Sequence, residues 1–202
     1  MAKASWAVVN PSQGSGNKEV SVTAGVDHTG RNARSTLLTI VAVGVENNIV
    51  TANQKGKPEF VENTQDTASA AQSGQNVNIT GKSNSRKLTF ALGSGELEIT
   101  LPSSYTAASL NTDNGAEIAG DPGATEEFDW NIVIPVSVNP SVTSLSRQII
   151  VTDEAGNTDI CTITQAAGSA SLTVSTNIVE LGWEQGSTAS FTIESNTSWT
   201  IS

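Results

Sequence analysis

The chain has 202 residues, a formal net charge of −10 and a pI of about 4.4, and 37% of its residues are apolar. A strongly acidic chain repels phosphate, which argues against nucleic acid and anionic membranes as partners. The single cysteine, Cys161, excludes an intrachain disulfide, and no apolar run is long enough for a standard signal peptide or a membrane span.

The first predicted elements lie in residues 1–57. Val20-Ser-Val-Thr-Ala24 alternates apolar and polar residues, which is typical of a half-buried strand. A β-hairpin is predicted from Arg34 to Gln54, because β-branched residues fill both arms and Asn47 and Asn48 occupy the bend. Gly56 follows two residues after Gln54 and marks the end of a repeat.

Residues 58–169 contain a second hairpin with the same landmarks, running from Arg147 to Gln165 and ending near Gly168. The segments 74–81 and 87–92 alternate in the same way as other half-buried strands. Trp130 is expected to be the buried Trp of a central strand, and Cys161 an inert, buried strand position. This segment is long enough to form a complete β-sandwich.

Residues 170–202 resemble the opening strands of another repeat, which stops half-way. Phe191 alternates with Ile193, and Trp199 with Ile201, so both pairs are expected in half-buried strands and Trp199 in a core. Residues 1–57, by contrast, form a back half without a front half. Together the two segments approach the ~100 residues of one immunoglobulin-like sandwich.

The predicted fold is therefore all-β, with two immunoglobulin-like β-sandwich domains. One comprises residues 58–169. The other is assembled from residues 1–57 and 170–202, by circular permutation or by strand exchange.

The split repeat carries motifs of a known family. The run Ser195-Asn-Thr-Ser-Trp199, together with Ser5-Trp6, the stretch 11–17 (Pro-Ser-Gln-Gly-Ser-Gly-Asn) and the hairpin 34–56, resembles the BACON domain. This immunoglobulin-like module occurs in surface proteins of gut Bacteroidota and in structural proteins of their crAss-like phages. In the family order the Ser-Asn-x-x-Trp element precedes the Ser-Trp element, so joining Ser202 to Met1 would restore that order. The front half of residues 58–169 departs from the family pattern.

Two routes would complete the split repeat, because half a sandwich exposes unpaired strand edges and an apolar face. In cis, residues 170–202 fold back onto residues 1–57 of the same chain, with 58–169 inserted between them. In trans, residues 170–202 of one subunit pair with residues 1–57 of the next, which gives a filament or a ring. The sequence leaves both routes open.

A long acidic segment, residues 110–127, is predicted to be a solvated loop that acts as an interaction surface. It lacks the regular ligand spacing of a calcium loop. Its acidic candidates are Asp113, Glu117, Asp121, Glu126 and Glu127.

Glycan binding would require exposed aromatic faces. The best candidates are Trp183, in Leu-Gly-Trp-Glu-Gln-Gly, and Tyr105, whereas packing is favoured for the other tryptophans, including Trp6. Packing is also favoured over a sugar site for these two residues.

No catalytic residue, metal site or cofactor is predicted, since the only histidine, His28, lies in a predicted loop and no nucleotide or metal motif is present. The first functional hypothesis is a non-enzymatic structural protein of a phage virion, such as a capsid auxiliary, decoration, head-fibre or tail component. Its partners would be other virion proteins or copies of itself, and it rests on the family resemblance, the scarcity of exposed aromatic residues, and the expected absence of a signal sequence and of a lipoprotein cysteine. The alternative is a carbohydrate-binding or adhesion module at the bacterial surface, which requires a signal sequence outside residues 1–202.

Overall fold

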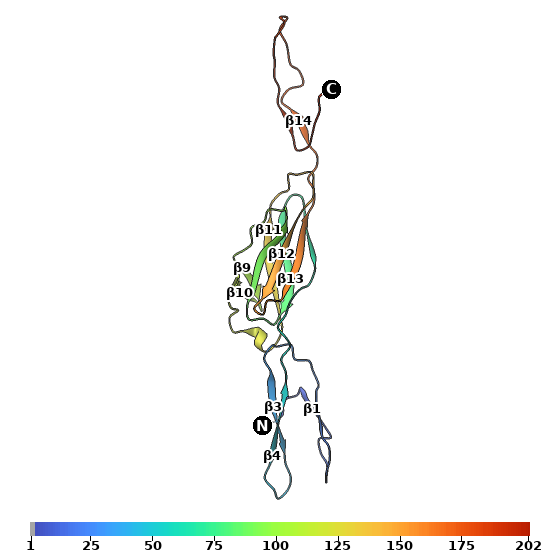
Figure 1. The fold of residues 1–202 in the computed structure, drawn as a ribbon, viewed down its shortest axis with the longest axis vertical. Coiled ribbons are helices and arrows are strands. Elements are labelled where there is room, and N and C mark those ends of the chain that lie inside the picture. The colour runs from blue at the N-terminus through green and yellow to red at the C-terminus, as the bar shows by residue number, and fades with distance from the viewer. Residues whose placement is uncertain (1–2) are drawn as a thin grey trace.

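The computed structural model describes residues 3–202. It is all-β apart from one 3-10 turn, η1 (Pro122–Ala124), and the chain forms an elongated molecule with three parts in a row (Figure 1). We call them the N-terminal segment (residues 3–57), the middle repeat (58–169) and the C-terminal segment (170–202). The two segments lie at opposite ends of the middle repeat, and their strands do not pair with each other among the described residues.

The middle repeat is a β-sandwich of two sheets. One has the order β10-β9-β11-β7-β5 and the other β6-β13-β12-β8. Such a pair of sheets, facing each other over an apolar core, is the architecture of an immunoglobulin-like domain. The strands of this repeat are β5 (Val61–Asn63), β6 (Thr67–Ala70), β7 (Gln75–Ser83), β8 (Leu88–Gly95), β9 (Ser104–Ala107), β10 (Leu110–Asp113), β11 (Phe128–Val136), β12 (Leu145–Asp153) and β13 (Thr158–Gln165).

Three strand pairings hold the middle repeat together. Each joins a strand of its front half (β5–β8) to a strand of its back half (β9–β13). β11 pairs antiparallel with β7 over nine residues, from Phe128↔Ser83 to Val136↔Gln75. β12 pairs antiparallel with β8, and β13 pairs in parallel with β6. The front half of the repeat therefore supplies the partner strands that its back half needs.

The core of the middle repeat comes from alternating strand residues. Trp130 is 2% exposed on the central strand β11, as predicted, with the ring of Phe90 5.3 Å away at an edge-on angle. Cys161 is fully buried, also as predicted. Burial raises the pKa of the Cys161 thiol to about 11, because the thiolate would have to form without water.

The N-terminal segment consists of two separate hairpins. β1 (Ala7–Asn10) pairs with β2 (Ser21–Ala24), and β3 (Arg34–Ile40) pairs with β4 (Asn48–Gln54). The second hairpin confirms the prediction, with Arg34 directly opposite Gln54 and its Nε donating to Gln54 Oε1 at 2.8 Å. No strand of the described chain covers the outer edges of β3 and β4.

The C-terminal segment is a single short ladder between β14 (Leu172–Val174) and β15 (Ile193–Ser195). The strands predicted around Phe191 and around Trp199–Ile201 are longer than those observed. Phe191 precedes β15, and Trp199 and Ile201 lie outside any strand and are exposed, contrary to the expected core position of Trp199. A two-stranded ladder is only marginally stable in water without further strands or an opposing sheet, and within residues 3–202 this segment has neither.

Candidate interaction surfaces

The first joint links the N-terminal segment to the middle repeat and is built around the buried side chain of Asn84. Its Nδ2 donates to the carbonyl oxygens of Thr29 (3.1 Å) and Pro58 (3.2 Å), and its Oδ1 accepts from the backbone N–H of Phe60 (3.0 Å). Lys57 N–H also donates to Gly30 O at 2.9 Å. One amide therefore fixes the linker and a loop of the N-terminal segment together.

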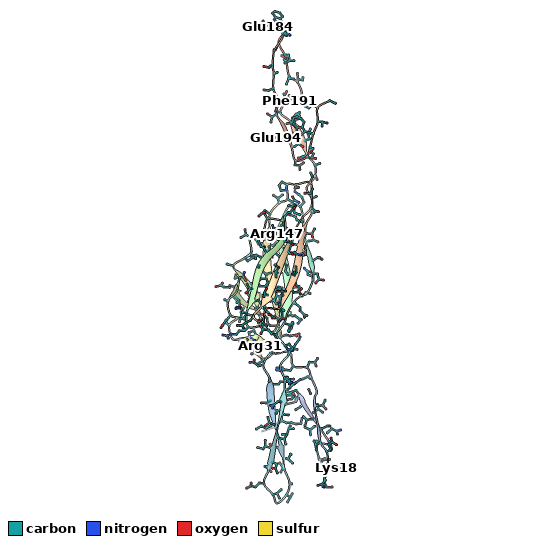
Figure 2. All side chains as sticks on the ribbon, viewed as in Figure 1. Lys18, Arg31, Arg147, Glu184, Phe191 and Glu194 are labelled. Carbon is teal, nitrogen blue, oxygen red and sulfur yellow. The ribbon has the colours of Figure 1, made fainter. Side chains whose placement is uncertain are left out.

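Charged side chains reinforce this joint. The Arg31 guanidinium binds both carboxylate oxygens of Asp121 and donates to Asn84 O at 3.0 Å. The hydrogen bonds that Arg31 donates to Asp121 raise the pKa of Arg31, so the guanidinium stays charged. Figure 2 shows Arg31 where the middle repeat meets the N-terminal segment.

Glu127 forms the second ion pair of the joint, with Lys57 Nζ 3.2 Å from its Oε2. That hydrogen bond lowers the pKa of Glu127, and the nearby charge of Lys82, 3.5 Å away, adds to the effect. Lys57 Nζ also lies 3.7 Å from the centre of the Phe60 ring. The joint is therefore held by a small network of charges of both signs.

The acidic segment 110–127 was predicted to be a solvated loop, and this is wrong for two parts of it. Residues Leu110–Asp113 form β10, and in η1 the carbonyl oxygens of Gly123 and Ala124 accept hydrogen bonds from Arg31 N–H and Asn32 N–H of the N-terminal segment. The acidic residues have separate roles: Asp113 ends β10 and is exposed, Glu117 pairs with Arg86, Asp121 and Glu127 pair with Arg31 and Lys57, and Glu126 is exposed. Part of the segment already serves a contact within the chain.

The second joint, between the middle repeat and the C-terminal segment, repeats the first around Asn196. Its Nδ2 donates to Pro140 O (3.1 Å) and Ser169 O (2.9 Å), and its Oδ1 accepts from Ser171 N–H (2.9 Å). These partners occupy the positions of Thr29, Pro58 and Phe60 at the first joint. Gly168 N–H likewise donates to Ser141 O at 2.7 Å. The chain therefore uses one joint design twice.

An apolar groove lies between the two hairpins of the N-terminal segment, with a volume of about 870 Å³. In a closed sandwich this space would be the core. Its aliphatic lining is Val9, Val20, Val22, Leu38, Ile40, Val41 and Val50.

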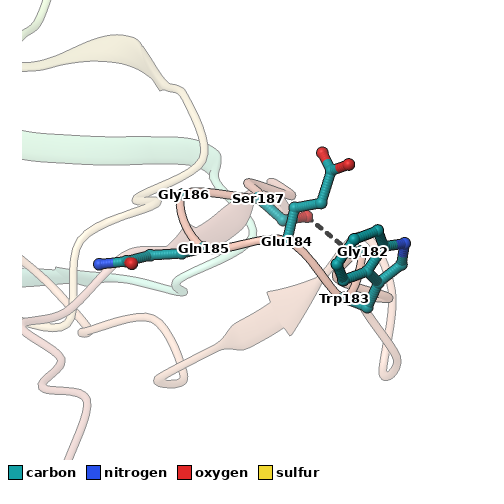
Figure 3. Close-up of a pocket in the computed structure, with 6 residues that line it drawn as sticks. All are labelled: Gly182, Trp183, Glu184, Gln185, Gly186 and Ser187. Carbon is teal, nitrogen blue, oxygen red and sulfur yellow. Dashed lines mark hydrogen bonds between the residues drawn. The ribbon is translucent and has the colours of Figure 1, made fainter.

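The C-terminal segment carries the aromatic candidate Trp183 at its far tip, where the side chain is 94% exposed. The turn 182–187 forms an open hollow of about 420 Å³. A hydrogen bond from Gly182 N–H to Ser187 Oγ, 2.6 Å long, closes the turn (Figure 3). Figure 2 places the neighbouring Glu184 near one end of the molecule and Lys18 near the other.

The other candidate for an exposed aromatic face, Tyr105, is buried, contrary to that assignment. Tyr105 is 3% exposed, because it lies on β9 against the Phe90 ring (4.9 Å between centroids) and its hydroxyl accepts from Leu88 N–H. Burial raises its pKa to about 12. Tyr105 is therefore a core residue and offers no face to a sugar.

His28 lies in a loop as predicted and donates from Nε2 to Asn32 O at 2.6 Å.

Neither a metal-binding group nor a membrane-spanning helix is found over residues 3–202. No cluster of three or more His, Cys, Asp and Glu side chains in this range could hold a metal ion. No helix in the same range has the length and hydropathy needed to cross a membrane.

Comparison with known proteins gives no family. No family model and no curated protein sequence matches the chain. Among solved structures it is similar to a protein from Bacteroides thetaiotaomicron, with a TM-score of 0.28 and 15% identity over 56% of this chain and 90% of the other. A collagen-binding domain of a surface protein from Erysipelothrix rhusiopathiae gives a TM-score of 0.23 and 10% identity, covering 74% of this chain and 63% of that domain.

Proposed function

We propose that the protein is a non-enzymatic structural component of a phage virion that works through protein–protein contacts. The observation that carries this proposal is that each end of the molecule consists of two-stranded ladders without an opposing sheet. One exposes an apolar groove and the other exposes large apolar side chains. Contiguous apolar surfaces and unpaired strand edges of this kind are typical of surfaces that other chains cover.

The charge of the chain supports protein partners over nucleic acid and lipid. The net charge of −10 opposes phosphate-rich surfaces. The basic side chains of the first joint are engaged with acidic ones: Arg31 with Asp121, and Lys57 with Glu127. Both hairpins of the N-terminal segment instead present aliphatic side chains to the groove.

The assignment to a virion rests on the resemblance of the split repeat to the BACON domain, which occurs in structural proteins of crAss-like phages. Within the proposal the protein is a capsid auxiliary, decoration, head-fibre or tail component. Antibodies raised against the purified chain are expected to label particles of the phage that encodes it, seen by immunogold electron microscopy. Unlabelled particles, together with no peptides of this chain in the particle proteome, would contradict the virion assignment.

A second candidate function, glycan binding at a bacterial surface, is favoured by one observation. The indole of Trp183 is almost fully exposed on a turn, as a stacking platform for a sugar would require. A glycan array separates the two functions. Reproducible binding that disappears in Trp183→Ala supports the second candidate, and Glu180→Ala, a change at another exposed position of the same segment, is the matched control.

A further inference from the structure

We infer that the C-terminal segment of one copy completes the N-terminal segment of a second copy, so that molecules join head to tail. This inference rests on the proposed function only in that both require protein–protein contacts. It names the partner, a second copy of the chain, and the two surfaces that meet. The evidence is the internal repeat, because the middle repeat shows how a front half and a back half fit together.

The N-terminal segment has the contacts of a back half. Gln54 Nε2 donates to Val26 O at 3.1 Å, as Gln165 Nε2 donates to Ser137 O at 2.6 Å in the middle repeat. Gln165 Nε2 has a further acceptor, Ala71 O at 3.2 Å, which belongs to the front half. Within residues 3–202, Gln54 Nε2 makes no hydrogen bond that corresponds to the one with Ala71 O. We infer that a front half from another copy provides this acceptor.

A loop of the N-terminal segment matches in the same way. His28 Nε2 donates to Asn32 O, and Asn139 Nδ2 donates to Thr143 O at 2.9 Å across the same number of residues. The imidazole therefore takes the structural place of an amide. Both loops then lead into the hairpin that ends the repeat, β3–β4 in one case and β12–β13 in the other.

The C-terminal segment has the contacts of a front half. β14 pairs with β15 from Leu172↔Ser195, as β5 pairs with β7 from Val61↔Ser83. Ser195 Oγ donates to Ser171 O at 2.9 Å, and Ser83 Oγ donates to Phe60 O at 2.7 Å. The following N–H groups, Thr197 and Ser85, both donate back to the preceding serine hydroxyl.

Matching positions differ sharply in burial. In the middle repeat Ile79, Leu88 and Phe90 are at most 3% exposed, whereas their counterparts Phe191, Trp199 and Ile201 are 43%, 48% and 71% exposed. The same holds for the back half, where Cys161 is fully buried and its counterpart Val50 is 47% exposed. The exposed side chains of one segment are thus those that would fill the groove of the other.

The arrangement of the three parts makes the partner a second molecule. The two segments lie at opposite ends of the middle repeat, so the C-terminal segment that reaches a given groove comes from the next copy (Figure 1). Such a contact is heterologous and propagates into a filament or closes into a ring. Since the two joints share one design, completed and middle repeats would alternate along one continuous string.

The inference also assigns a place to the turn that carries Trp183. The corresponding turn of the middle repeat approaches the end of β11, where a Cβ on Gly74 would lie 2.6 Å from Val136 O. The glycine of the second turn, Gly186, shares the positive φ of Gly74, 90° against 82°. The turn 182–187 would therefore dock beside the end of β2 in the next copy and cover part of the Trp183 indole.

Self-assembly is tested by the mass of the full chain in solution, measured from ~1 to ~100 µM, a range suited to specific interfaces of moderate affinity. The expected result is growth in multiples of the 20.9 kDa protomer, as open chains or a closed ring. A protomer mass throughout the range would overturn the inference and would support closure in cis.

Two single variants locate the surfaces. Ile201→Asp places a charge on the inserted segment, and Val50→Asp places one in the groove, so each is expected to raise the concentration needed for assembly on the order of 100-fold. The adjacent outward positions give matched controls, Thr200→Asp and Thr51→Asp, which should assemble as the wild type does. Equal behaviour of Ile201→Asp and Thr200→Asp would overturn the inference.

A mixture of Val50→Asp and Ile201→Asp distinguishes the contact between groove and C-terminal segment from any other self-association. Val50→Asp keeps an intact C-terminal segment and Ile201→Asp keeps an intact groove, so together they should form a 1:1 dimer and nothing larger. No dimer in the mixture contradicts the inference. The virion assignment has a separate readout, because labelling of particles does not depend on assembly of the purified chain.

Discussion

The middle repeat is a closed sandwich, whereas the N- and C-terminal segments, which we infer to be the two halves of a second sandwich, are open. In the middle repeat the pairings of β7, β8 and β6 with β11, β12 and β13 build two sheets, and the core side chains between these sheets are at most 9% exposed. The side chains that we match to them in the two terminal segments are in solvent at opposite ends of the molecule. The difference teaches that the sequence pattern specifies which side chains face inward, whereas burial requires the missing half.

The largest expected contrast is between two matching core positions, Leu88 and Trp199. Leu88→Ala leaves a cavity in a closed core and is expected to lower the free energy of unfolding of the middle repeat by about 2–5 kcal/mol. In the dilute, unassembled chain Trp199→Ala should change it by less than about 0.5 kcal/mol, as for a surface site. Urea unfolding followed by circular dichroism measures both, and equal losses would break the comparison.

The second contrast concerns the two joints. Asn84 is fully buried, so Asn84→Ala leaves the N–H of Phe60 and nearby carbonyls without a partner and is expected to cost about 1–3 kcal/mol. Asn196 is exposed and water can replace its bonds, so Asn196→Ala should cost less than about 1 kcal/mol. Urea midpoints of both variants against the wild type give the values, and the reverse order would contradict the assigned burial.

The smallest effect is a pH dependence of the first joint, which the second joint lacks. The pKa of Glu127 is lower in the folded protein than in the unfolded chain, where it is near 4.3. The carboxylate therefore contributes fully to folding stability above about pH 4.3, and this stability is lost as the pH falls through the pKa of the folded state. The difference in urea midpoint between the wild type and Glu127→Gln should therefore shrink as the pH drops below about 4.3. A difference independent of pH would rule out this role for the carboxylate.

Much of the closed repeat could be predicted from the sequence. Alternation and turn chemistry located both hairpins, the buried Trp130 and the inert Cys161, because these signals are local. Tyr105 could not be placed, since its burial depends on Phe90 and on the pairing of β9 with β10 and β11, all set by the tertiary fold.

The joints were missed for a similar reason. Asn84 and Arg31 act through backbone carbonyls far along the chain, and no periodic pattern reports such contacts. One signal was available, the Ser-Asn pair that occurs at 83–84 and again at 195–196. The strands of the C-terminal segment were predicted too long because an apolar alternation indicates a strand only where a partner strand exists.

Head-to-tail completion is tested most directly by a cross-link across the proposed seam. In the middle repeat Ile150 lies opposite Ala91, and the matching pair is Thr39 of one copy and Ser202 of the next. A chain with Thr39→Cys and Ser202→Cys, treated with a short bismaleimide, is expected to give a ladder of covalent multimers, while the buried Cys161 does not react. Thr39→Cys with Thr89→Cys, both exposed but not adjacent in the proposed assembly, should remain a protomer. Intramolecular cross-linking alone, or equal ladders from both pairs, would contradict the account.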